Sequence, residues 1–241
     1  MIEQRSAHAF IEAASVPLGV AHGSGSIAEA EALRAGSTDV TRWSIHAAAV
    51  AGDAVAVIDW LRESPRHAVD VGGPRGWPPL TYLCFSRYLR HDISGDGDFV
   101  RAAEALLDAG ADPRGGFFEE VPGHGRSWES VLYGAAGIAH HETLTRLLLA
   151  RGADPNDDEV VYHAPESYDL GVVQVLVEHG SLTPDSLATM LIRTHDWHDE
   201  LGVRYLLAHG ADPDRMTRWG VTALHQAVRR DNVTGIVEAL L

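Results

Sequence analysis

The tetrapeptide Gly-Ala-Asp-Pro occurs three times in the chain, at 110–113, 152–155 and 210–213, and each copy directly follows a leucine-rich stretch. A weaker copy, which lacks the Ala-Asp, ends at Gly180. Glycine in this place accepts the left-handed conformation that closes a helix, and the proline shortly after it prevents the helix from resuming. The recurrence therefore predicts an array of similar helical units.

A second pattern opens the units that these glycines close. Residues 220–228 read Gly-Val-Thr-Ala-Leu-His-Gln-Ala-Val, and this closely resembles the ankyrin signature Thr-Pro-Leu-His-x-Ala, with alanine in the place of proline. Looser copies begin at Trp43, Trp77 and Ser130. The spacing of the closing glycines also scatters around the roughly 33 residues of an ankyrin unit. The chain thus resembles ankyrin-repeat proteins over residues 40–241.

This resemblance implies an all-α fold, an ankyrin-repeat solenoid of about six to seven helix-turn-helix units with short hairpin loops between them. We expect a single domain, 1–241, in which residues 1–39 form a degenerate leading repeat with helices at 7–15 and 26–35. The last repeat, from Asp231, stops before a closing glycine. Either the array continues past Leu241, or an apolar edge is left for a partner.

Composition restricts the class of partner. The net charge is −15, and all 19 basic residues are arginine. A surface of this sign is a poor match for nucleic acid. No run approaches the roughly 18 apolar residues of a membrane span, and Glu3 and Glu12 interrupt the apolar residues of the N-terminus. We expect a cytoplasmic protein without a membrane or nucleic-acid partner, and the absence of lysine favours a bacterial source.

The sequence offers little catalytic chemistry. It contains no Gly-x-Ser-x-Gly, phosphate-binding loop or dinucleotide-binding glycine motif. Cys84 takes an alanine-like position of a signature helix, which predicts a small buried hydrophobe. His46 and His225 stand at the histidine position of the signature, where the resemblance implies hydrogen bonds between neighbouring loops. We predict no enzyme activity, no cofactor and no metal.

Two segments nevertheless leave alternatives open. His195 and His198 are spaced so that one helix face could hold a divalent ion, as in a metal-dependent hydrolase, although we favour a polar stretch that joins two helices. Residues 92–98 match the start of an EF-hand calcium loop, but Ala103 stands where a bidentate Glu belongs. We favour an inserted turn there over a calcium-modulated binding module.

The function that the sequence still supports is the binding of another protein. By resemblance, the hairpin tips and the exposed faces of the first helices form the binding surface, and large aromatics with arginine dominate interface energetics. We predict a protein-interaction scaffold whose partner, of unknown identity, is basic because the chain is acidic. Its predicted contact residues are Trp77, Tyr82, Phe85, Phe117, Phe118, Trp128, Arg218, Trp219, Gln226 and Arg229.

Overall fold

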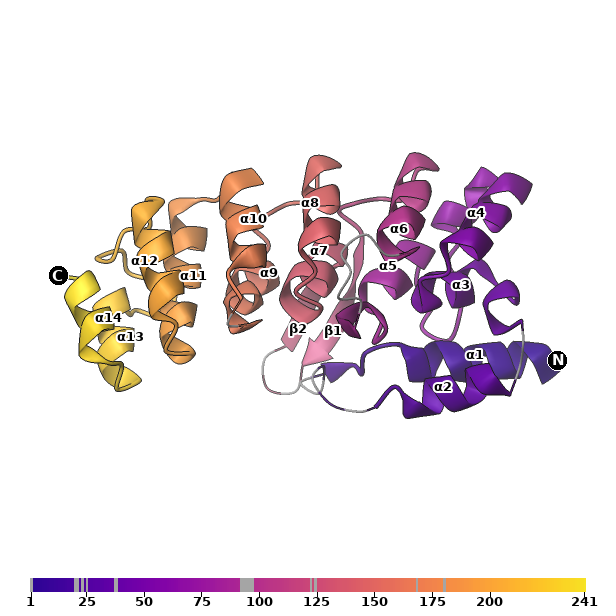
Figure 1. The fold of residues 1–241 in the computed structure, drawn as a ribbon, viewed down its shortest axis with the longest axis horizontal. Coiled ribbons are helices and arrows are strands. Elements are labelled where there is room, and N and C mark those ends of the chain that lie inside the picture. Colours follow the sequence, from indigo (N-terminus) through magenta and orange to yellow (C-terminus); the bar gives the residue numbers. More distant parts are fainter. Residues whose placement is uncertain are drawn as a thin grey trace. The chain divides into compact units, whose positions relative to one another are not determined.

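The computed structural model describes residues 2–19, 22, 24, 26–36, 39–91, 98–121, 123, 125–167, 169–179 and 181–241. The chain divides into two compact units, an N-terminal unit, Met1–Ala153, and a C-terminal unit, Asp154–Leu241. In each unit, antiparallel helices are arranged as pairs (Figure 1). Among the described residues, no helix has the length and apolar character needed to cross a membrane.

The N-terminal unit contains three stacked helix pairs. First helices contact first helices and second helices contact second helices, so α5 packs on α3 and α6 on α4. The pairs are α3 (Ile45–Ala51) with α4 (Ala54–Glu63), α5 (Pro79–Cys84) with α6 (Asp98–Asp108), and α7 (Val131–Tyr133), which continues as the π-turn η5 (Gly134–Ile138), with α8 (Glu142–Ala150). Short 3-10 turns are η2 (Val40–Arg42), η3 (Pro65–Val69) and η4 (Leu89–His91).

The C-terminal unit repeats this arrangement. Its central helix, α11, packs between α9 and α13, and α12 packs on α14. The pairs are α9 (Asp158–His163), extended by η6 (Ala164–Ser167), with α10 (Gly171–His179), then α11 (Pro184–Asp196) with α12 (Glu200–Ala208), and α13 (Ala223–Arg229) with α14 (Thr234–Ala239).

The three Gly-Ala-Asp-Pro copies have one structure. Their glycines take the left-handed conformation, with φ of 102° at Gly110, 97° at Gly152 and 93° at Gly210. In each copy the alanine N–H donates to the carbonyl of the leucine five residues earlier, at 2.9 to 3.0 Å, as in a Schellman cap. Each aspartate then accepts from the backbone N–H two residues on, at 2.9 Å. The predicted helix ends are confirmed.

The core lies between neighbouring pairs, as the leucine stripes predicted. Several second helices each contribute completely buried leucines, namely Leu106, Leu144, Leu148, Leu176 and Leu206. The first helices approach closely because small residues line them: a Cβ at Gly134 would lie 2.7 Å from the carbonyl oxygen of Cys84. Stability therefore comes from contacts between successive pairs.

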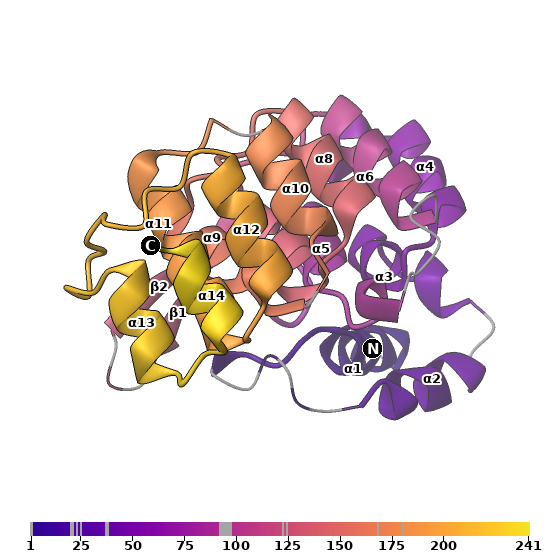
Figure 2. The same ribbon diagram turned by 60° about the vertical axis from the view of Figure 1, so that its left-hand side comes forward.

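That the N-terminal helices form a degenerate leading repeat stays a prediction. α1 (Ile2–Ala14) packs on α3, as the first helix of such a repeat would, but its end is also joined to the loop after α5. Val16 N donates to Phe85 O at 2.9 Å, and Arg87 N donates to Ala14 O at 2.8 Å. Figures 1 and 2 show α1 running across the helices of this unit, with α2 (Ala28–Ala35) beside it.

The all-α expectation also needs correction, because the mostly helical fold contains a two-stranded antiparallel sheet. Strands β1 (Gly116–Val121) and β2 (Gly125–Ser130) form a hairpin within the long loop before α7. A Cβ at Gly116 would lie 2.3 Å from Glu129 O, so this pairing requires glycine. The strands were missed because each face carries both aromatic and charged residues, which hides the usual apolar-polar alternation.

Candidate functional site

The register of the hairpin sorts its side chains onto two faces. Phe117 pairs with Glu129 and Phe118 with Trp128. Because successive residues of a strand point to opposite sides, Phe117, Glu119 and Glu129 share an inner face, and Phe118, Trp128 and Arg126 share an outer one. Glu119 and Glu129 are buried, whereas Phe118 is 54% exposed and Trp128 37% exposed.

The inner face of the hairpin covers an aromatic core. Phe117 stacks on Trp77 with ring centroids 4.1 Å apart and meets Phe85 edge-on at 4.9 Å. Tyr82 lies beneath them, donates from its hydroxyl to Gly72 O at 3.0 Å and accepts from Arg75 N at 2.9 Å. Burial raises the pKa of Tyr82, and its bonds to backbone N–H groups only partly offset this.

This packing corrects part of the predicted contact set. Trp77 is 6% exposed, and Tyr82 and Phe85 are completely buried, so these three side chains offer no surface to a partner. Arg75 is also held inside: its guanidinium binds both carboxylate oxygens of Glu12. A residue's place near a hairpin tip predicts its neighbourhood but not whether it points inward, and for this reason the sequence could not separate these aromatics from the exposed ones.

The outer face carries the residues that remain accessible. The rings of Phe118 and Trp128 meet edge-to-face with centroids 4.7 Å apart, and the guanidinium carbon of Arg126 lies 4.3 Å from the Phe118 centroid. We call these three residues the outer aromatic face. They form an aromatic pair with a cation against it, on a hairpin anchored from behind.

A similar cluster lies in the C-terminal unit. Trp219 is 44% exposed, with the guanidinium carbon of Arg218 at 4.4 Å from its ring and the Tyr162 ring at 5.7 Å. Arg218 also binds Asp158 at 2.5 Å. Beside this cluster lies a groove of about 420 Å³, lined by α9, α11 and the 216–218 loop, and it includes Asp158, Asp185 and Met216.

Two residues of α13 were predicted to contact a partner, and the structure exposes one of them and buries the other. Arg229 is exposed, but Gln226 is 6% exposed, and its amide donates to the carboxylate of Asp196. Asp196 also accepts from Arg230 Nε at 2.6 Å and from Arg193. Gln226 therefore belongs to a polar network inside the unit, and we remove it from the contact set.

The histidine pair considered for a hydrolase also lies differently from our expectation. His195 belongs to α11 and not to a linking stretch, its ring is completely buried, and Nδ1 is 2.6 Å from Leu191 O. Burial lowers its pKa. His198 follows in the turn, with Nδ1 3.2 Å from the side-chain amide of Asn232. A completely buried imidazole gives a substrate no access.

Other sequence predictions can be placed directly. His46 is buried and its Nε2 lies 2.8 Å from Asp70 O, so the predicted link to a neighbouring loop is confirmed. His225 instead caps its own helix, with Thr222 Oγ1 2.8 Å from its Nδ1.

Cys84 is completely buried as predicted, and burial raises the pKa of its thiol. In the calcium-loop candidate, 92–97 lie outside the described residues.

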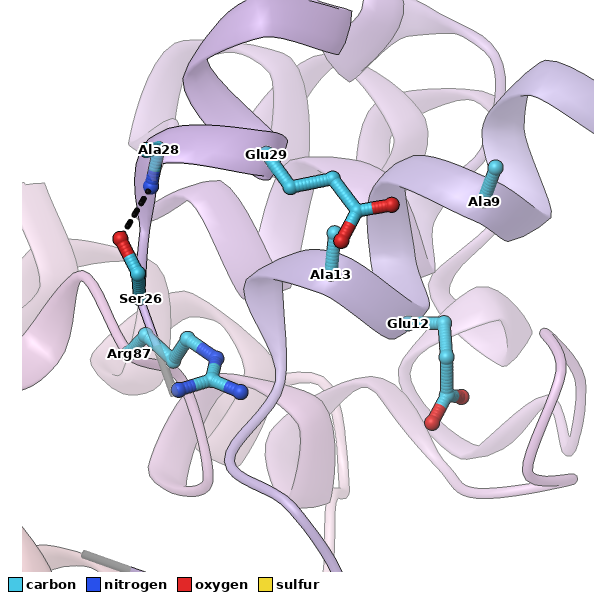
Figure 3. A pocket seen from close by; sticks show the side chains of 7 residues that line it. All are labelled: Ala9, Glu12, Ala13, Ser26, Ala28, Glu29 and Arg87. Atoms are coloured by element: carbon cyan, nitrogen blue, oxygen red, sulfur yellow. Dashed lines mark hydrogen bonds between the residues drawn. The ribbon is translucent and has the colours of Figure 1, made fainter. Parts of the chain in front are cut away.

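Figure 3 shows a second hollow, of about 600 Å³, between α1 and α2. It is lined by Ala9, Glu12, Ala13, Ser26, Ala28, Glu29 and Arg87. The Arg87 guanidinium is engaged with backbone, at 3.0 Å from Ser15 O and 2.8 Å from Ser24 O. Arg87 therefore binds the backbone of Ser15 and Ser24, and the side chains named as lining this hollow do not form a converging set suited to catalysis.

One cluster was missed by sequence reasoning altogether. His22 Nε2 lies 3.0 Å from Glu119 Oε2, and ligand atoms of His22, Glu119 and Glu129 all lie within 4.8 Å of one another. It is the one such three-residue group found in the described part of the chain. His22 stands far from the two glutamates in sequence, and no local spacing signals their meeting.

Comparison with known proteins identifies the fold. A model of ankyrin repeats matches residues 191–241, and no curated protein matches the chain. Solved structures similar to it include the human ASB11 ankyrin repeat domain, at 21% identity over 81% of both chains with a TM-score of 0.57. The ankyrin repeat protein EF0377 is 21% identical over 83% of this chain and 96% of its own, with a TM-score of 0.61. An ankyrin repeat domain from Acinetobacter baumannii AYE is 20% identical over 81% and 95%, also with a TM-score of 0.61. The chain therefore has the ankyrin-repeat fold.

Proposed function

We propose that this chain is a non-enzymatic scaffold that binds another protein through the outer aromatic face, with a second contact at Trp219 and its groove. The observation that carries the proposal is the cross-strand pair of Phe118 and Trp128, two large aromatics left exposed on a hairpin whose other face is firmly packed. Exposed aromatic surface of this kind marks interaction sites.

The physical chemistry of the pair suits protein recognition. Large aromatic residues supply much contact area at a small loss of rotamer entropy, and aromatics such as Trp, together with arginine, are enriched among the residues that dominate binding energy. The pair is pre-organised, because the antiparallel register fixes both rings and Phe117 anchors β1 from behind. A partner would meet a surface that needs little ordering on binding.

Charge gives a weaker indication of the partner. The net charge of −15 favours a basic protein through long-range attraction. In the groove of the C-terminal unit, Asp158 and Asp185 are largely exposed, and each pairs with an arginine, Arg218 or Arg215. A basic segment of a partner would compete with these arginines for the carboxylates. A bacterial, cytoplasmic setting stays part of this proposal.

The other hypotheses have less support. A hydrolase at His195 and His198 would need both imidazoles accessible, and His195 is completely buried. A calcium-modulated module at 92–98 stays a prediction. The fold itself does not decide between partners, because function in repeat proteins depends on the grafted surface.

Affinity capture with matched variants tests the proposal. We expect Phe118→Ala/Trp128→Ala to lose the captured partner, while Val55→Ala/Val71→Ala retains it. The control removes two valines of the same unit that are 53% and 70% exposed, so it also changes exposed apolar surface. Capture of the same proteins by wild type and by the aromatic double variant would contradict the outer aromatic face as the binding site.

Trp219→Ala tests the second contact separately. Removal of the Trp219 indole is expected to weaken capture of the same partner without abolishing it, because the outer aromatic face remains. The exposed Arg229→Ala, on α13 of the same unit, shows whether the contact extends to that helix. Unchanged binding by Trp219→Ala would confine the interface to the hairpin.

A further inference from the structure

The inner face of the hairpin brings two acidic side chains together near an imidazole. Glu119 and Glu129 lie on adjacent strands and on the same sheet face, offset by two pairs in the register, so they are diagonal neighbours. They are 6% and 3% exposed. Two residues from outside the hairpin contact Glu119: Gly19 N donates to Glu119 Oε1, and His22 Nε2 lies 3.0 Å from Glu119 Oε2.

Burying two neighbouring carboxylates is unfavourable unless positive charge accompanies them. A divalent cation would balance both carboxylates and could take the imidazole of His22 as a third ligand.

We propose that His22, Glu119 and Glu129 form a binding site for a divalent transition-metal ion of the zinc class. One imidazole nitrogen and two carboxylates are a ligand set for Zn²⁺, Co²⁺ or Mn²⁺, whereas Ca²⁺ and Mg²⁺ prefer oxygen ligands throughout. Ligand bonds of about 2.0–2.2 Å place two donor atoms of a tetrahedral ion roughly 3.4 Å apart. His22 Nε2 and Glu119 Oε2 are 3.0 Å apart and all the ligand atoms lie within 4.8 Å of one another, which is close enough for side-chain rotation to close the site.

An ion bound at this site would stabilise the arrangement of the hairpin in the N-terminal unit. One ligand, His22, lies far before the hairpin in sequence, and the other two come one from each strand, so one ion would join three parts of the chain. Phe118 neighbours Glu119 and Trp128 neighbours Glu129, directly behind the outer aromatic face. The ion would therefore hold that face in place, with a fourth coordination position left for water or another donor. The metal proposal does not depend on the partner proposal.

Metal titration of the full chain after chelator treatment and dialysis tests the site. We expect calorimetry to show one equivalent of Zn²⁺ bound, and Co²⁺ to give a visible absorption band. Glu129→Gln and His22→Gln, which keep the size of the side chain or nearly so, should each weaken that binding by at least about 100-fold. The control His67→Gln/His198→Gln removes two histidines outside the cluster and should leave it unchanged.

A second readout separates a metal site from an ordinary ion pair. Melting temperatures of wild type and Glu129→Gln are compared at pH 7 with and without metal. With Zn²⁺, only the wild type should gain stability. Failure of wild type to bind Zn²⁺, Co²⁺ and Mn²⁺ at one equivalent would overturn the proposal, as would equal binding by both single variants. So would a loss of stability in Glu129→Gln that is the same with and without metal.

Discussion

The ring of Phe117 stacks on the indole of Trp77, with centroids 4.1 Å apart and planes inclined by 24°. This contact joins β1 to the loop before α5, and Arg75 closes the assembly with its guanidinium carbon 4.8 Å from the same indole. The hairpin is thereby fixed on one side, and its other side is left to solvent. The two adjacent phenylalanines therefore have different roles.

Substitution of each phenylalanine should reveal this difference. Phe117→Ala removes a ring packed on Trp77 and Phe85 and should cost about 2–4 kcal/mol in the free energy of unfolding. Phe118→Ala removes an exposed ring and should change it by about 0.5–1 kcal/mol at most. Denaturant unfolding followed by circular dichroism measures both. Equal losses would mean that the hairpin is not anchored as described.

Close packing of first helices makes a prediction at Gly134. The Cβ of Gly134→Ala would lie 2.7 Å from the backbone carbonyl oxygen of Cys84, so α5 and η5 must separate. We expect a loss of about 1–3 kcal/mol. Gly36→Ala is the matched control, because its φ is negative and its added Cβ has ordinary contacts. A neutral Gly134→Ala would contradict the close approach.

Stability should depend on pH through His163. Burial disfavours the imidazolium, but hydrogen bonds and charge from Glu159 and Glu166 outweigh it and raise the pKa of His163 to about 9. A raised histidine pKa contributes stability that is complete below the unfolded value of 6.5 and is lost as the pH rises through about 9. The contribution is at most about 3 kcal/mol.

Thermal unfolding of His163→Gln at several pH values measures this contribution. The variant should melt below the wild type at pH 6, and the two curves should converge by pH 10. The control is His67→Gln, whose partner Asp70 forms an exposed pair at 2.7 Å. A difference between wild type and His163→Gln that stays constant across this range would exclude the ion-pair contribution.

Cys84 should report unfolding of the N-terminal unit. Its thiol is completely buried and burial raises its pKa, so the native protein should react very slowly with a thiol reagent at pH 8. Reaction should accelerate at the denaturant concentration where circular dichroism reports loss of helix. Rapid labelling under native conditions would mean that α5 opens locally.

Local signals account for the parts of the fold that the sequence predicted. The glycine of each Gly-Ala-Asp-Pro copy needs a left-handed conformation wherever it is placed, so helix ends such as Gly110 and Gly210 could be located by reading alone. Leucine periodicity likewise identified the buried stripes. These features depend on residues within one or two helical turns.

The features that escaped prediction depend on distant residues. The direction of Tyr82 and Phe85 depends on a hairpin that covers them, and the packing of α1 depends on bonds to the loop that follows α5. His22 contacts Glu119 across 97 residues of sequence. Since the candidate site consists of such contacts, its residue types were predicted better than its geometry.

Site-specific photocrosslinking tests the central claim most directly. A photoreactive phenylalanine analogue at position 118 is compared with the same analogue at position 55, which is 53% exposed in the same unit. We predict one crosslinked partner from position 118 and none from 55, with competition by unlabelled wild type but not by Phe118→Ala/Trp128→Ala. Identical crosslinks from both positions, or equal competition by the double variant, would contradict binding through the outer aromatic face.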